Sequence, residues 1–316
     1  MTSTRTAPAP SSHSTGTAPP LALVGPTASG KSEIAIELAT RMDAEIVLTD
    51  SMTVYRGMDV GTAKPSKGER RGVPHHLMDV ADPSEPFSVV AFQRLAREAI
   101  AGIRDRGHVP FLVGGSGLYF RAMVDDLEFP GTDPALRRSV EAEAAAVGSE
   151  GLHARLAAFD PDAAARMEPS NLRRIVRALE VAALTGRPFS SFAAGWDSYP
   201  EARVRAAGVM MSSDALRARI EERARRMLAN GLLEETERLL DDGAGPQLTA
   251  SQAIGYAEAA EHLAGRIGLE EALETIVRRT KALARRQMAW FRRDPRIRWF
   301  EPAPRMIDEM EEFYRS

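Results

Sequence analysis

Cysteine is absent from the 316-residue sequence, so disulfides, thiolate metal sites and thiol nucleophiles are all excluded. The six histidines are scattered and form no ligand cluster, which argues against structural zinc. No apolar run approaches the length that crosses a bilayer. The formal net charge is only -3, so the chain as a whole is not a basic nucleic-acid binder, and the distribution of charge matters more than its sum.

The N-terminal segment also lacks features of a targeted or folded region. Residues 1–20 are rich in Ser, Thr, Ala and Pro and contain no apolar core of the secretory type. Arg5 is their only Lys or Arg residue, which argues against a transit peptide. Because this composition cannot bury enough apolar surface to fold, we predict a disordered tail over residues 1–20. We expect a cytoplasmic location.

Buried-strand patterns alternate with helical patterns in the first part of the ordered chain. Short apolar runs typical of parallel strands alternate with helix-like stretches, and residues 55–84 are rich in Gly, Pro and Asp and are expected to be loops. This alternation predicts an α/β fold with a parallel sheet whose ligands lie at the strand C-terminal ends. The expected strands are 21–25, 45–50 and 109–115, and the expected helices are 32–41 and 88–106.

The composition changes after residue 130. Residues 131–200 show helical patterns and no convincing buried strand, so we predict a helical insertion domain there. The sheet core would then comprise residues 21–130 and 201–316, with a returning strand within 202–211. Three further helices are expected in the C-terminal part, over 214–241, 251–264 and 269–291.

A phosphate-binding loop follows the first strand. The sequence GPTASGKS fits G-x-x-x-x-G-K-[ST] between a predicted strand and a predicted helix, which is the context that this motif requires. Its backbone N–H groups and the helix N-terminus favour anions, Lys31 supplies a positive charge, and the Ser32 hydroxyl is a candidate Mg²⁺ ligand. The motif leaves open whether the ligand is ATP, GTP or another diphosphate. Its residues are Gly25, Pro26, Thr27, Ala28, Ser29, Gly30, Lys31 and Ser32.

An acidic residue ends the second predicted strand. Asp50 lies where a parallel sheet carries its ligands. It could be a general base, a Mg²⁺ ligand, or simply a turn or N-cap residue, and position alone does not decide among these roles. Ser51 adds a polar group beside it.

Several longer segments of the sequence follow a known pattern. The segments are GPTASGKS, DSMTVYRGMDVGTAKP, PHHLMDVADPSEPFSV, LVGGSGLYFRA, RRIVRALEV, IEERARRMLANGLLEE, QAIGYAE and RRQMAWFR. They resemble the tRNA dimethylallyltransferase family and occur in the family's order over nearly the whole ordered chain. The GTAKP run and RRQMAWFR are far more specific than the phosphate loop.

The resemblance implies a P-loop core whose helical insertion grips the anticodon stem-loop of tRNA. Adenine 37 would be flipped out to meet dimethylallyl diphosphate, with Asp50 as general base and Mg²⁺ as cofactor. Thr27–Ser32 would hold the diphosphate together with Arg223. Ser116 stands where the family usually has threonine and keeps a hydroxyl for a role near the amine or the diphosphate. Thr53 replaces a glutamine that is common in the family, which puts a base contact from that position in doubt.

A basic segment near the C-terminus could bind RNA. Residues 278–298 contain nine Arg or Lys residues and one acid, interleaved with aromatic side chains. Such a pattern suits phosphate contacts and base stacking, or equally a solvated helix face with its aromatic residues in the core. We expect these charges to lie on an element separate from the phosphate loop. A second small cluster lies at 173–177, with the same two interpretations.

By resemblance and by pattern, the candidate tRNA contacts extend over six parts of the chain. They are Asp50, Ser51, Met52, Thr53, Ser116, Arg137, Arg173, Arg174, Arg177, Gln252, Gly255, Tyr256, Arg278, Lys281, Arg285, Arg286, Gln287, Trp290 and Arg292.

Three other functions are compatible with a phosphate loop. A small-molecule kinase would use the same loop with Asp50 as base or Mg²⁺ ligand, but it would leave the basic C-terminal helix without a role. A nucleotide-dependent RNA-binding switch would bind RNA without forming a product. A prenyltransferase could act on free adenosine phosphate, although the long arginine-bearing insertion favours a large RNA substrate.

Overall fold

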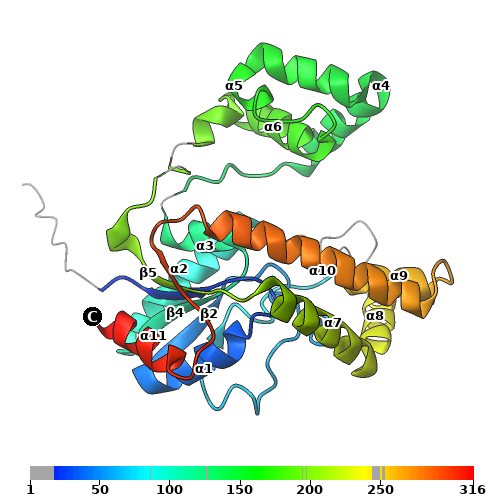
Figure 1. The fold of residues 1–316 in the computed structure, drawn as a ribbon. Coiled ribbons are helices and arrows are strands. Elements are labelled where there is room, and N and C mark those ends of the chain that lie inside the picture. The colour runs from blue at the N-terminus through cyan, green and yellow to red at the C-terminus, as the bar shows by residue number, and fades with distance from the viewer. Residues whose placement is uncertain are drawn as a thin grey trace, which may run out of the picture.

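The structure, a computed structural model, describes residues 18–85, 87–125, 127–193, 195–196, 198–243, 250 and 253–316. Its centre is a six-stranded sheet in which every neighbouring pair of strands is parallel (Figure 1). The strand order is β3-β2-β4-β1-β5-β6, so the predicted α/β class with a parallel sheet is confirmed. The strands are β1 (Leu21–Val24), β2 (Ala44–Leu48), β3 (His75–His76), β4 (Val109–Gly114), β5 (Arg205–Val209) and β6 (Ile297–Phe300).

Both faces of the sheet are covered by helices. Along β1, Leu21 and Leu23 pack on one face, while Ala22 and Val24 pack on the other, as the period of two in a strand requires. The first face is covered by α1 (Lys31–Met42) and α11 (Met306–Arg315). The second is covered by α2 (Val89–Asp105), and its apolar core continues into α3 (Gly117–Val124), α7 (Ser213–Ala229), α8 (Leu232–Asp241), α9 (Tyr256–Leu263) and α10 (Leu269–Phe291).

The segment between α3 and β5 forms a separate helical cluster. Its helices bury their own apolar core, which includes Leu152, Leu156 and Ile175. Two extended segments join it to the rest of the chain, and in Figure 1 it stands clear of the sheet. The cluster contains α4 (Pro134–Phe159), α5 (Pro161–Ala164), α6 (Leu172–Thr185) and the 3₁₀ helix η1 (Phe189–Ala193), and a second 3₁₀ helix, η2 (Glu201–Arg203), lies in the returning segment.

Some sequence-based boundaries are wrong. The single helix predicted over 214–241 is two helices, α7 and α8, because the chain turns at Gly231 with a left-handed φ of 94°. β6 and α11 were not predicted from the sequence. The four residues of β6 lie within a basic and aromatic run and show no clear alternation of apolar and polar side chains. Of the helix predicted over 251–264, residues 251 and 252 lie outside the described residues, as does nearly all of the tail predicted for residues 1–20.

No helix in the described part of the chain is long and apolar enough to span a membrane.

Candidate active site

The phosphate loop joins β1 to α1 at the C-terminal edge of the sheet. Gly30 is the N-cap of α1 with φ 85°, a left-handed conformation that glycine adopts without strain. The Lys31 ammonium folds back and donates to the Pro26 carbonyl at 2.6 Å. Burial lowers the pKa of Lys31 to about 7, and although the Asp50 charge opposes this shift, Arg223 adds to it. A diphosphate bound in the loop would therefore supply the counter-charge that Lys31 lacks.

Asp50 has one carboxylate oxygen engaged and one available. Its Oδ1 accepts hydrogen bonds from the backbone N–H of Met52 at 2.8 Å and of Thr53 at 3.4 Å. No hydrogen-bond partner of Oδ2 is found among the described residues. The turn role and the catalytic role considered from the sequence are thus compatible, because one oxygen shapes the turn and the other can take part in chemistry.

Asp50 opens onto a cavity of about 380 Å³, which lies in the range of small-molecule sites. One part of its wall is polar and comes from the phosphate loop, the end of β2 and two helices. The other part is apolar and comes mainly from α7, α10 and the segment before α9. The lining residues are Thr27, Asp50, Ser51, Met52, Gly61, Thr62, Ile220, Arg223, Ala224, Met227, Ala253, Ile254, Ile276, Arg279, Thr280, Ala282, Leu283, Arg286 and Gln287.

Two arginines of α7 face the phosphate loop. Arg223 is partly buried in the cavity wall and donates from Nη2 to the Thr62 carbonyl at 3.1 Å. Arg219 lies one turn earlier, and its guanidinium rests against the loop so closely that a Cβ at Gly30 would lie 2.8 Å from its Nη1. Arg223 was predicted from the sequence, and Arg219 was not. The i, i+4 spacing of the two arginines on α7 was the signal that could have found it.

Helix α10 contacts the phosphate loop directly. The backbone N–H of Thr27 donates to the Gln287 side-chain Oε1 at 2.8 Å, across 260 residues of sequence. Arg286, next to Gln287, lines the same cavity. The basic residues Arg278, Lys281 and Arg285 lie on α10, an element separate from the phosphate loop, and it is Gln287 of that helix that contacts the loop.

The aromatic residues of the basic segment divide between surface and core. Trp290 is 39% exposed, and a Cβ at Gly117 would overlap its ring, so the indole lies directly on the start of α3. Its ring also meets Trp196 edge to face at 6.0 Å. Phe291 and Phe300 are buried in the core, so they are not available to stack on bases.

The hydroxyls of this region have different environments. Ser116 is the N-cap of α3, accepts from the Tyr119 N–H and lies outside the cavity wall. Thr53 is 8% exposed, and its hydroxyl, like the buried hydroxyls of Ser29 and Thr49, has no hydrogen-bond partner among the described residues.

Two candidate tRNA contacts near α9 are buried inside the protein. Gly255 caps α9, and its N–H donates to Glu258 at 2.8 Å. Tyr256 is 2% exposed, and its hydroxyl donates to Glu235 at 2.5 Å. Both residues are thus buried and hydrogen-bonded within the protein, and their contact with tRNA stays a prediction. Gln252 lies outside the described residues.

The arginines of the helical insertion fall into two groups. Arg137 and Arg177 both pair with the fully buried carboxylate of Glu180, at 2.8 Å and 2.9 Å. Although burial opposes it, hydrogen bonding by these two arginines lowers the pKa of Glu180. Arg173 and Arg174 are exposed at the start of α6. The first pair therefore stabilises the insertion, and the second pair is free to meet a ligand.

On α10 the predicted basic face is largely solvent-exposed. Arg278, Arg285 and Arg292 are exposed, while Lys281 pairs with Glu221 at 2.6 Å. An exposed pair of this kind is weak and can exchange for a phosphate.

Within the described residues, no group of three or more His, Asp or Glu side chains could hold a metal on its own. The exposed Ser32 hydroxyl is a hard oxygen donor at the phosphate loop. A donor of this kind fits Mg²⁺, which takes one or two protein oxygens and completes its shell with phosphate oxygens and water.

Comparisons with known proteins agree with this architecture. The family model described as IPP transferase matches residues 53–294. The chain is 53% identical over 283 residues to the tRNA dimethylallyltransferase of Salinispora arenicola, covering 90% of this chain and 82% of the relative. It is 50% identical over 291 residues to the enzyme of that name from a Nocardioides species, covering 92% and 94%.

Two solved structures share the fold. The tRNA isopentenylpyrophosphate transferase of Bacillus halodurans matches with a TM-score of 0.69 and 40% identity, over 95% of this chain and 96% of that one. A eukaryotic dimethylallyltransferase acting on tRNA matches with a TM-score of 0.73 and 25% identity, over 90% and 74%. With these matches and the phosphate loop, free carboxylate and cavity in one place, the chain belongs to the tRNA dimethylallyltransferase family of transferases.

Proposed function

We propose that this chain transfers a dimethylallyl group from dimethylallyl diphosphate to N6 of adenine 37, beside the tRNA anticodon. The observation that carries the proposal is the cavity in which Thr27 of the phosphate loop, Asp50 and Arg223 meet an apolar wall. The proposal is supported by the curated relatives, which are named tRNA dimethylallyltransferases. An apolar wall suits the five-carbon prenyl chain, and the polar wall suits its diphosphate.

Neutralising the leaving diphosphate is the main electrostatic task of the site. The bond between C1 of the prenyl group and the diphosphate oxygen breaks, and the new bond joins C1 to N6. Lys31, Arg219, Arg223 and the loop N–H groups supply positive charge and donors on the side where the leaving group forms. Mg²⁺ at Ser32 and the diphosphate would add further positive charge when bound.

Asp50 is the proposed general base. The exocyclic nitrogen of adenine is a poor nucleophile, so loss of its proton must accompany bond formation. The free Oδ2 of Asp50 would take that proton, while Oδ1 stays in the turn with the Met52 N–H. The base must be unstacked to reach a carboxylate inside a cavity, as in other enzymes that modify bases.

The RNA would be bound by two surfaces. One is the exposed basic face of α10 with Arg278, Arg285 and Arg292, together with Arg286 at the cavity. The other is the exposed pair Arg173 and Arg174 on the insertion, which we propose contacts the anticodon stem-loop. Both would act mainly through phosphates, which position the RNA without reading its sequence.

One experiment distinguishes this function from its rivals. The protein is incubated with Mg²⁺ and labelled dimethylallyl diphosphate, with either tRNA or AMP as acceptor. We expect labelled tRNA, no need for ATP, competition by inorganic pyrophosphate, and loss of dimethylallyl diphosphate use in Lys31→Ala. An absolute ATP requirement would favour the kinase, label on AMP alone would favour the free nucleotide, and RNA binding without label would favour the switch.

A further inference from the structure

The loop that carries Gly61 and Thr62 forms one wall of the cavity, yet it has no regular secondary structure. Its shape therefore depends on contacts from elsewhere in the chain. The strongest of these comes from Glu235 on α8, a residue outside the cavity wall whose carboxylate is 3% exposed.

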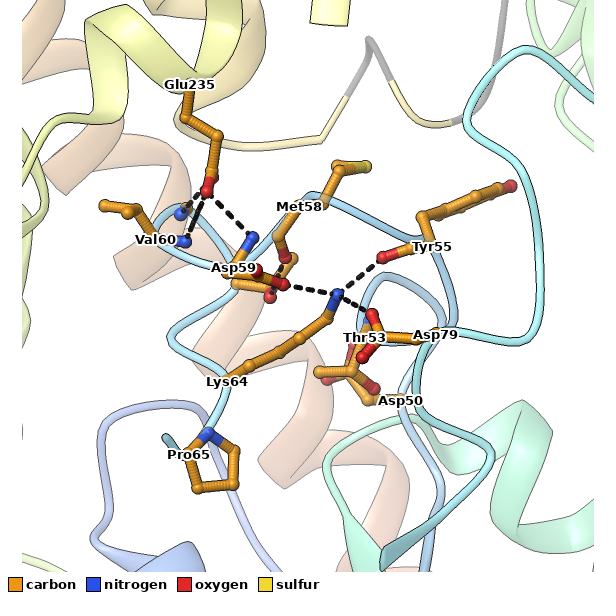
Figure 2. A network of polar contacts seen from close by, with 12 residues as sticks. Asp50, Thr53, Tyr55, Met58, Asp59, Val60, Lys64, Pro65, Asp79 and Glu235 are labelled. Carbon is orange, nitrogen blue, oxygen red and sulfur yellow. Dashed lines mark hydrogen bonds and ion pairs between the residues drawn. The ribbon is translucent and has the colours of Figure 1, made fainter. Parts of the chain in front are cut away.

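Glu235 binds three consecutive backbone N–H groups of this loop. Oε2 accepts from Asp59 and Val60 at 3.0 Å each, and Oε1 accepts from Val60 at 3.0 Å and from Gly61 at 3.2 Å. Figure 2 shows the carboxylate pointing at these nitrogens. Successive N–H groups that converge in this way form a concave anion site. Here an internal carboxylate occupies it.

A tyrosine completes the arrangement around the carboxylate. The Tyr256 hydroxyl donates to Glu235 at 2.5 Å and accepts from the Gly61 N–H at 3.1 Å. Burial, together with the neighbouring Glu235, raises the pKa of Tyr256, so the hydroxyl stays protonated. A Cβ at Gly61 would overlap the Tyr256 ring, so only glycine fits at this contact.

Lys64 anchors the other end of the loop. Its ammonium lies between the Tyr55 carbonyl at 2.5 Å, the Asp59 carboxylate at 2.8 Å and the Asp79 carboxylate at 2.5 Å (Figure 2). The side chain is only 3% exposed. With Glu235 at one end and Lys64 at the other, the backbone of residues 59–64 is restrained from both sides.

The restrained loop presents a backbone acceptor to Arg223 at the cavity wall. The Thr62 carbonyl accepts from Arg223 Nη2 at 3.1 Å, while the Thr62 hydroxyl turns back to the Met58 carbonyl at 2.5 Å. Arg223 is thereby held in the wall that also contains Asp50. A guanidinium with a fixed direction loses less conformational freedom when it binds phosphate than a mobile one.

We propose that Glu235 is a positioning residue for the diphosphate site: through residues 59–62, its carboxylate holds the Thr62 carbonyl against Arg223 and so aims that guanidinium into the cavity. The inference rests on the proposed function, because it assumes a diphosphate beside Arg223. It assigns to the buried carboxylate of α8 a role in leaving-group neutralisation in addition to its role in folding.

The test is a double-mutant cycle on binding of magnesium pyrophosphate by the full chain, measured by calorimetry. In Glu235→Gln an amide N–H₂ replaces one carboxylate oxygen. Because this group cannot accept from the backbone N–H groups that face it, the hydrogen bonds that hold residues 59–61 are broken. We expect roughly 10-fold weaker pyrophosphate binding, the cost of a misdirected charge-assisted hydrogen bond. In the Arg223→Ala background the same change should have almost no further effect. The exposed neighbour Glu234→Gln is the matched control and should bind as the unaltered protein does.

A merely structural role would lower the melting temperature and leave the binding of the folded fraction unchanged. If Glu235→Gln does not fold, Tyr256→Phe replaces it in the cycle, since it removes one hydroxyl from the same arrangement and keeps the ring. Equal losses of affinity with and without Arg223 would overturn the inference alone. Absence of pyrophosphate binding by the unaltered protein would overturn the proposed diphosphate site and the inference with it.

Discussion

Replacing Asp50 by Asn separates the two roles of this carboxylate. The Asn side-chain oxygen can still accept the Met52 N–H that Asp50 Oδ1 accepts at 2.8 Å, so the turn is retained. The basic Oδ2 is replaced by an amide that cannot take a proton. We therefore expect kcat to fall by about 10²- to 10⁴-fold, which corresponds to about 2.7–5.5 kcal/mol of activation free energy. The melting temperature and the tRNA affinity should change little.

The matched variant is Asp50→Ala, which removes the turn acceptor as well. It should show the same loss of kcat and in addition lose about 1 kcal/mol of stability, the usual net value of one hydrogen bond. The assay is single-turnover transfer of labelled dimethylallyl groups to tRNA at saturating diphosphate, beside thermal unfolding of the same preparations. Near-normal turnover in Asp50→Asn would remove Asp50 from the mechanism and leave it only the turn.

Three further predictions concern Lys31, the α10 surface and the insertion. Burial lowers the pKa of Lys31 to about 7, and a bound diphosphate should raise it again, so pyrophosphate binding at pH 8 should take up a proton and weaken as pH rises. Calorimetry in two buffers of different ionisation enthalpy measures this proton uptake. The Lys31→Ala variant should lose most of the uptake. An unchanged uptake in that variant would mean that a group other than Lys31 binds the proton. The double variant Arg285→Ala/Arg292→Ala should weaken the binding of all accepted tRNAs about equally. It should also reduce the slope of log K against log salt by roughly 0.7–0.9 for each phosphate that is no longer neutralised, while pyrophosphate binding is unaffected. An unchanged slope would mean that these arginines form a solvated surface without phosphate contacts. Glu180→Gln should destabilise the insertion at pH 7 by about 1–3 kcal/mol, less than for a fully buried pair because its arginine partners are partly exposed. The pKa of Glu180 is lower in the folded protein than in the unfolded chain. The stabilisation is therefore present above the unfolded pKa and is lost as pH falls through the folded pKa. Thermal unfolding should show a smaller difference in stability between the variant and the unaltered protein at pH 4 than at pH 7. Exposed Glu168→Gln is the control, and an equal loss in it would refute the reasoning.

The α/β class and the phosphate loop could be predicted because their signals are local. An apolar strand, a glycine-rich turn and a helix follow one another within 21–42, and each is specified by residues adjacent in sequence. The helix break at Gly231 was missed although glycine was visible, because the apolar pattern continues on both sides of it. The strand β6 was missed because four residues carry too little pattern, and pairing with β5 decides its structure.

Residues brought together from distant parts of the chain could not be placed in the same way. The sequence named Tyr256 and Gly255 as RNA contacts from their resemblance to a motif. In the structure the buried Tyr256 hydroxyl accepts from the Gly61 N–H, while the Gly255 N–H donates to Glu258 in the first turn of α9. The resemblance identified which residues are special. It did not distinguish those that touch a ligand from those that hold others in position, since both kinds belong to the same motif.

The sequence by itself determined the family, the phosphate loop and the acid at the end of β2, because these depend on short-range order and on residue types that few other functions require. Only the tertiary structure decided that Gln287 of α10 closes on Thr27, that Arg219 joins Arg223 beside the loop, and that Glu235 holds the cavity wall. Each of these contacts joins residues far apart in the chain. Their formation depends on how helices pack on the sheet, and the free energy of that packing comes from burial of side chains on many elements at once.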